Sequence, residues 1–174
     1  NIYSHLSRYY NITLLSPTYS HHKEEEISHS INFREYRIPK GELHNRLHMK
    51  IDEEKIATEF SSLVCALCAM YPGRYHEKYL ELYSDVDIII HECPYMLEYD
   101  LFFGFDDKPR IYNSHNYETL LVKQIWQGPN AQKYIDLIYQ LEKRLIEQSD
   151  LVFAISDEER NAYIQDFNVD IEKV

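Results

Sequence analysis

At residues 108–118 the sequence reads Lys-Pro-Arg-Ile-Tyr-Asn-Ser-His-Asn-Tyr-Glu. The Lys-Pro pair is typical of a turn, and the residues of Arg110–Asn113 are expected to form a short buried strand. A cluster of polar side chains centred on His115 follows, just before a helix that is expected to begin at Glu118. Because ligands of open α/β sheets bind where strands end and helices begin, His115 is the first candidate for a functional residue.

The rest of the chain repeats this order of strand and helix. Continuous apolar runs are typical of strands buried on both faces, as in parallel sheets. Residues 18–29 are polar and are expected to form a loop. Strands are predicted at residues 11–16, 31–38, 87–91, 110–113 and 151–155, and helices at 1–9, 52–71, 75–83, 118–127, 129–148 and 156–166. The alternation predicts an α/β fold, Rossmann-like and doubly wound, with a mainly parallel sheet and helices on both faces.

Composition limits the classes of partner. The chain has 174 residues, of which 44% are hydrophobic, so one domain with a buried core is expected. The net charge of −11 argues against a nucleic-acid partner, because phosphates need a basic surface. No apolar run approaches the roughly 20 residues of a membrane helix, so no transmembrane segment is expected. The three cysteines fit a reducing cytoplasm.

Two motif-like groups have ordinary structural interpretations. Cys65 and Cys68 form a CxxC inside an apolar helical pattern, where core packing is expected instead of a redox or zinc site. Residues 21–26 read His-His-Lys-Glu-Glu-Glu, and this tract is expected to be a solvated part of a loop and not a metal site.

Polar side chains follow several of the predicted strands. Because parallel strands place their carboxyl ends at one edge of a sheet, these side chains are expected to form a polar rim above an apolar sheet, as in a ligand cleft. Some of these positions also have structural interpretations. Ser156 can be the first residue of a Ser-x-x-Glu capping box, His91 and Glu92 can form a strand end that meets solvent, and His115 can serve as a cap or be solvated. The rim comprises Ser16, His91, Glu92, Ser114, His115, Asn116 and Ser156.

Motifs of several enzyme classes are absent from the sequence. It contains no G-x-S-x-G, no Walker A, no H-E-x-x-H and no G-x-G-x-x-G. A dinucleotide site is therefore not expected within the chain. A metal enzyme that uses His91, Glu92 and His115 remains a lesser alternative.

Three segments resemble family-4 retaining glycosyltransferases. They are residues 87–95, residues 110–118 and residues 141–160; the last joins a Glu-containing helix, Ser-Asp, an apolar strand and a Ser before an acidic helix start. The likeness in layout covers about Ile12 to Tyr163. The resemblance implies one half of a GT-B fold, in which two Rossmann-like domains face each other across a cleft. The N-terminal domain of such enzymes mostly holds the acceptor, and the C-terminal domain holds the donor.

The resemblance also implies an activity. It implies transfer of a sugar, with retention of configuration, from a nucleotide-diphosphate sugar to a sugar or lipid-linked acceptor by a hexosyltransferase-type enzyme. By motif position His115 is the catalytic candidate, beside the donor sugar. No metal, no further cofactor and no protein nucleophile are expected, since attack is assisted by the donor's own phosphate. The expected substrate-binding residues are His91, Glu92, Ser114, Asn116 and Ser156.

Parts of the family's pattern are unmatched. Its first strand and Gly-rich turn would precede residues 1–9, and its paired-glutamate donor motif belongs to a C-terminal domain. We therefore expect residues 1–174 to be a single N-terminal domain, a fragment that is inactive without its own C-terminal domain. The expected location is the cytoplasm, peripheral at the inner membrane face in the full-length protein. The alternatives are a GT-B-type nucleotide-sugar epimerase and a non-catalytic Rossmann-like binding module.

Overall fold

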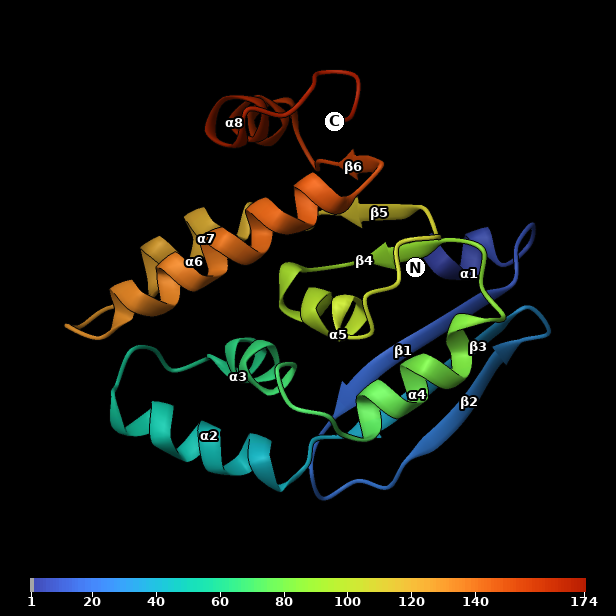
Figure 1. The fold of residues 1–174 in the computed structure, drawn as a ribbon, viewed down its shortest axis with the longest axis horizontal. Coiled ribbons are helices and arrows are strands. Elements are labelled where there is room, and N and C mark those ends of the chain that lie inside the picture. Colours follow the sequence, from blue (N-terminus) through green and yellow to red (C-terminus); the bar gives the residue numbers. More distant parts are fainter. Residues whose placement is uncertain (1) are drawn as a thin grey trace. The chain divides into compact units, whose positions relative to one another are not determined.

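The computed structural model of the protein describes residues 2–174 (Figure 1). Asn1, which the helix predicted at residues 1–9 includes, lies outside the described residues. The chain forms two compact units. Unit 1 comprises the described residues up to Arg46 together with Pro72–Val86, and unit 2 comprises Leu47–Tyr71 together with Asp87–Val174.

The chain combines helices with a mixed and a parallel sheet, which confirms the predicted α/β class. The strands are β1 (Ile12–Thr18), β2 (Glu25–Ser30), β3 (Phe33–Pro39), β4 (Ile89–His91), β5 (Arg110–Asn113) and β6 (Leu151–Phe153). The helices are α1 (Ile2–Leu6), α2 (Glu42–Glu53), α3 (Ser61–Cys68), α4 (Arg74–Tyr83), α5 (Leu97–Leu101), α6 (Glu118–Ile125), α7 (Ala131–Gln148) and α8 (Asp157–Phe167), with a 3₁₀ turn η1 (Pro94–Met96). Within residues 2–174, no helix combines the length and the apolar character needed to cross a membrane.

Unit 1 contains a mixed sheet in the order β1-β3-β2. β1 runs parallel to β3, and β2 runs antiparallel to it. The prediction of a loop over residues 18–29 is therefore wrong for residues 25–29, which lie in β2, and for Thr18, the last residue of β1. All residues of β2 except Ile27 are exposed, so its polar sequence is that of an edge strand, and pairing with β3 overrides its low strand propensity.

A buried carboxylate ties the three strands of unit 1 together. Glu35 on β3 accepts hydrogen bonds from Arg37 at 2.7 Å, from Ser16 on β1 at 3.0 Å and from His29 on β2 at 2.8 Å. The guanidinium of Arg37, followed by the other donors, lowers the pKa of Glu35 to about 2. The carboxylate is thus ionised and fully paired at neutral pH.

Unit 2 is built on a parallel sheet in the order β4-β5-β6 (Figure 1). Tyr112 of β5 and Val152 of β6 are buried and pack with side chains of α7 and α8, among them Leu145. The opposite face carries Ile90 and Phe153, which are 39% and 50% exposed. Unit 2 by itself therefore has its core on one face of the sheet.

The helix predicted at residues 52–71 is wrong in its first half. α2 ends at Glu53, and Lys55 has a φ of 53°, a left-handed conformation that stops a helix. Ile56 and Phe60 are both buried, but they lie in an irregular segment whose Ile56 carbonyl accepts from the amide of Gln127 at 2.8 Å. The helical spacing of these apolar residues therefore reflects their burial and does not indicate a helix in this segment.

The CxxC cysteines lie on α3, as the apolar pattern predicts. Cys65 is buried, and Cys68 is half-buried against the core of unit 2. Burial raises the pKa of the Cys68 thiol to about 11, so the reactive thiolate is scarce at neutral pH.

Candidate functional site

The candidate site lies at the carboxyl edge of the parallel sheet in unit 2. Glu92 follows β4, the loop Ser114–Tyr117 follows β5, and Ser156 lies three residues after the end of β6. The strand pairing β4-β5-β6 places these three segments next to one another at one edge. We call the loop Ser114–Tyr117 the His115 loop.

At this edge the exposed His115 pairs with the half-buried Glu92. The His115 Nε2 atom is hydrogen-bonded to a carboxylate oxygen of Glu92. The side chain of His115 is 57% exposed and that of Glu92 is 30% exposed. Asn113, the last residue of β5, donates from Nδ2 to both Glu92 oxygens at 3.2 Å. Glu92 is therefore fixed by the neighbouring strand, and it in turn orients the imidazole.

The pair offers a defined chemistry to a ligand. Because Nε2 donates to Glu92, Nδ1 is the nitrogen that remains for a ligand. In the neutral imidazole Nδ1 accepts a hydrogen bond from a hydroxyl, and in the imidazolium it donates to an anionic oxygen. The arrangement suits a ligand that combines hydroxyl groups with phosphate.

Ser114 anchors the His115 loop to β6 and α8. It is buried, and its amide donates to the Phe153 carbonyl of β6 at 2.9 Å. Its hydroxyl donates to the Asn116 carbonyl at 2.9 Å and lies 2.6 Å from the hydroxyl of Tyr163 on α8. Ser114 therefore shapes the loop, whereas Asn116 is exposed beside His115.

Glu142 on α7 lies directly beneath the first turn of α6. Its Oε1 accepts from the Glu118 amide at 2.9 Å, and its Oε2 accepts from the Thr119 amide at 2.8 Å and hydroxyl at 2.6 Å. The side chain is completely buried, and this burial raises the pKa of Glu142 to about 7, although the hydrogen bonds of Thr119 act in the opposite direction. Reasoning from residue patterns missed this role; the signal was a lone Glu among the apolar positions of an amphipathic helix.

Glu118 and Tyr95 form a second polar contact at the start of α6. The Tyr95 hydroxyl of η1 donates to Glu118 Oε2 at 2.9 Å. Burial raises the pKa of Glu118, and the hydrogen bonds from Tyr95 and Asn116 oppose that rise. Neither residue was among the predicted site residues, and their pairing is visible only in the fold.

His91 is not brought together with Glu92 and His115. It is 6% exposed, and its Nε2 lies 2.8 Å from Asp100 Oδ2. Asp100 also accepts two hydrogen bonds from Arg110, at 2.7 and 3.1 Å. Successive residues of a strand point to opposite faces, so His91 faces the core side. Across residues 2–174 no group of three or more His, Cys, Asp or Glu side chains could hold a metal ion, so the alternative of a metal site on His91, Glu92 and His115 is wrong.

Ser156 caps α8 as the capping box predicts. Its hydroxyl accepts from the Glu159 amide at 3.1 Å, and the Glu159 carboxylate accepts from the Ile155 amide at 2.8 Å. Ser156 is exposed and also lines a depression of about 430 Å³ at the end of β6, together with Phe153 and Arg160. The predicted rim member Ser16 belongs to unit 1, where its hydroxyl donates to Glu35.

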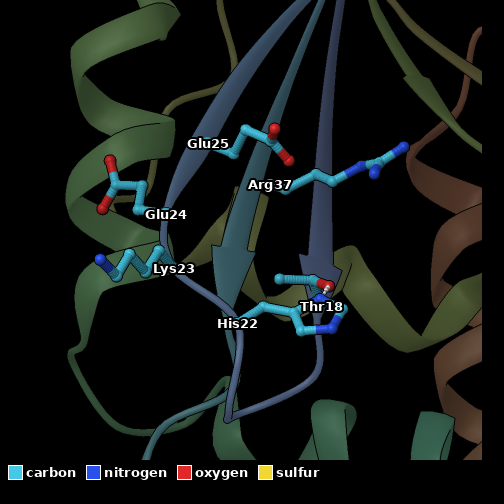
Figure 2. Close-up of a pocket in the computed structure, with 6 residues that line it drawn as sticks. All are labelled: Thr18, His22, Lys23, Glu24, Glu25 and Arg37. Carbon is cyan, nitrogen blue, oxygen red and sulfur yellow. Dashed lines mark hydrogen bonds between the residues drawn. The ribbon is translucent and has the colours of Figure 1, made fainter.

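Unit 1 has a polar pocket of about 400 Å³ where β1 ends (Figure 2). The hydroxyl of Thr18 lies 3.0 Å from Nδ1 of His22. In Figure 2 the side chains of Lys23 and Arg37 extend in opposite directions. Because the charged ends of Lys23 and Arg37 point apart, they do not define one position for a ligand. The pocket is therefore a weaker candidate site than the edge of the sheet in unit 2.

Comparison with known proteins does not assign the chain to a family. No family model matches the chain, and no curated protein matches it. The functional conclusion therefore depends on the geometry at the edge of unit 2 and on the motifs that form it.

Proposed function

We propose that the chain is the acceptor-side domain of a glycosyltransferase that moves a sugar from a nucleotide-diphosphate sugar to an acceptor with retention of configuration. In this proposal the domain is Rossmann-like and forms half of a GT-B fold. The donor is the substrate that supplies the phosphate, and no further cofactor takes part.

The pair of His115 and Glu92 is the observation that carries the proposal. An exposed imidazole at the carboxyl end of a central parallel strand, oriented by a carboxylate from the next strand, occupies the place where α/β sheets bind ligands. The motif resemblance assigns this position to a residue beside the donor sugar. The residue types agree, because a sugar nucleotide presents both hydroxyl groups and phosphate oxygens.

The proposed reaction needs no protein nucleophile. The acceptor hydroxyl attacks the anomeric carbon while the bond from this carbon to the donor's phosphate oxygen breaks, and the hydroxyl proton passes to the leaving phosphate. His115 Nδ1 hydrogen-bonds a sugar hydroxyl or the phosphate as negative charge develops there. Glu92 keeps the imidazole oriented, Asn116 and Ser156 are the exposed polar groups that extend the site, and Ser114 acts through the loop because it is buried.

The test uses the full-length protein that contains these residues, with a panel of nucleotide-diphosphate sugars and product analysis. We expect His115→Ala to lower kcat about a hundredfold. His5→Ala is the matched control, since His5 is an exposed histidine of unit 1. Unchanged transfer by His115→Ala would remove His115 from the mechanism, and an altered free sugar nucleotide in place of a transferred sugar would favour the epimerase.

A further inference from the structure

We propose that Glu142 is a positioning residue for the candidate site, and that its protonation state sets the geometry of the His115 loop. The inference deepens the proposed function and rests on it for any consequence for sugar transfer. The contacts that carry it lie within unit 2 and are independent of the ligand's identity.

The carboxylate of Glu142 collects donors from three elements. From α6 it accepts the amides of Glu118 and Thr119 and the Thr119 hydroxyl. From β5 and α8, its Oε1 accepts the hydroxyls of Tyr112 and Tyr163, each at 3.3 Å. Five hydrogen bonds thus converge on one side chain that water does not reach.

Glu142 replaces a cap that α6 lacks. The residue before α6 is Tyr117, which makes no side-chain cap hydrogen bond. The first amides of a helix have no partner within the helix, so an acceptor from elsewhere is needed when they are buried. Glu142 on α7 supplies it, and Figure 1 shows α6 beside α7. The position of the start of α6 is therefore set by a residue more than twenty positions later in the chain.

Tyr163 links Glu142 to the loop itself. Its hydroxyl lies within hydrogen-bonding distance of three groups: Glu142 Oε1, the Asn116 carbonyl at 3.2 Å and the Ser114 hydroxyl at 2.6 Å. The hydroxyl has one proton. When Glu142 is ionised, the Tyr163 hydroxyl donates its hydrogen bond to the Glu142 carboxylate, and the Ser114 hydroxyl donates to the Asn116 carbonyl.

Protonation of Glu142 redistributes these hydrogen bonds. The acid has one O–H that must donate, so at least one of the five donors loses its acceptor. If the acid donates to Tyr163, the Tyr163 proton turns to the Asn116 carbonyl and competes with Ser114 there. The loop between Ser114 and Asn116, which carries His115, is then held by a different set of hydrogen bonds.

The groups around Glu142 favour a change of its protonation state near neutral pH. The titratable groups that face Glu142 are Tyr112 from β5, Tyr163 from α8 and the carboxyl of Glu118 from α6, with Tyr95 and Tyr117 farther out. Burial raises the pKa of all four tyrosines, so they stay neutral donors. The Glu118 carboxyl adds repulsion to the burial that raises the pKa of Glu142 to about 7.

The test follows the backbone amides of residues 114–119 by NMR as a function of pH. In the wild-type chain we expect the Glu118 and Thr119 amide shifts to change with a midpoint near pH 7. Glu142→Gln should abolish this transition and lower the exchange protection of both amides about tenfold. Glu147→Gln is the matched control, because Glu147 lies on the same helix but is exposed. Wild-type shifts and protection in Glu142→Gln would overturn the proposal.

If Glu142→Gln does not fold, the variant Thr119→Val tests the proposal in its place. It preserves side-chain shape and removes one hydroxyl donor to the carboxylate, so the midpoint should move up by about one pH unit. An unmoved midpoint would overturn the proposal. These readouts do not depend on catalysis, so a full-length protein without transfer activity would refute the proposed function while the amide transition still tests Glu142.

Discussion

The substitution Glu142→Gln should change how the stability of the protein depends on pH. Burial raises the pKa of Glu142 from an ordinary value of 4.5 to about 7 in the folded chain. At about 1.4 kcal/mol for each pH unit, this difference corresponds to about 3 kcal/mol. The glutamine side chain has a similar size and is neutral at every pH, so the variant lacks this contribution.

Proton binding to Glu142 sets the direction of this pH dependence. Between pH 4.5 and about 7 the folded state keeps the Glu142 proton, whereas the unfolded state has released it. The contribution to the free energy of unfolding is therefore fully present below pH 4.5 and is lost as the pH rises through about 7. Relative to Glu142→Gln, the wild type should lose about 3 kcal/mol of stability between pH 4.5 and about pH 8.

The measurement is urea unfolding followed by circular dichroism at several pH values, on the wild type and the variant in parallel. Subtracting the two curves removes the titration of all groups that they share, and Glu147→Gln should reproduce the wild-type curve. If the difference between the wild type and Glu142→Gln does not change with pH, the raised pKa of Glu142 is refuted, and with it the reasoning that its burial outweighs its hydrogen bonds.

Three further substitutions test other contacts of the fold. Asp100→Asn should lower the free energy of unfolding by about 3–5 kcal/mol, because it removes the negative charge that pairs with the buried guanidinium of Arg110 at 2.7 Å. Thermal unfolding of the variant and the wild type checks this. Glu35→Gln should destabilise the protein at neutral pH and have little effect near pH 2. The pKa of Glu35 is lowered to about 2, so the stability that its carboxylate contributes is lost as the pH falls through that value. A destabilisation that stays constant in urea unfolding across the acid range would contradict this. Ser156→Ala should cost about 1 kcal/mol through loss of the α8 cap, and Ser156→Gly should cost less; equal stability of wild type and Ser156→Ala in urea would argue against the cap.

Local signals in the sequence were sufficient for the elements around the site. The apolar run and polar ending of residues 110–118 predicted β5, the His115 loop and the start of α6. The Ser-x-x-Glu pattern predicted the cap of α8. These signals succeed because a strand, a turn or a cap depends on residues that are close in the chain.

Elements that depend on distant partners were not predictable in this way. β2 has a polar sequence and is a strand only because β3 pairs with it. The break between α2 and α3 interrupts a good helical spacing, because Ile56 is held by a hydrogen bond from the distant Gln127. In both cases tertiary contacts override local propensity.

Residue patterns along the chain were enough to predict the α/β order of unit 2 and the position of His115 at the end of a strand. They did not determine which polar residues meet there. Only the tertiary structure paired His115 with Glu92, turned His91 toward Asp100 and set Glu142 beneath α6. The physical reason is that the periodicity of a strand or helix depends on neighbouring residues, whereas a hydrogen bond between side chains depends on strand register and helix packing across many residues of chain.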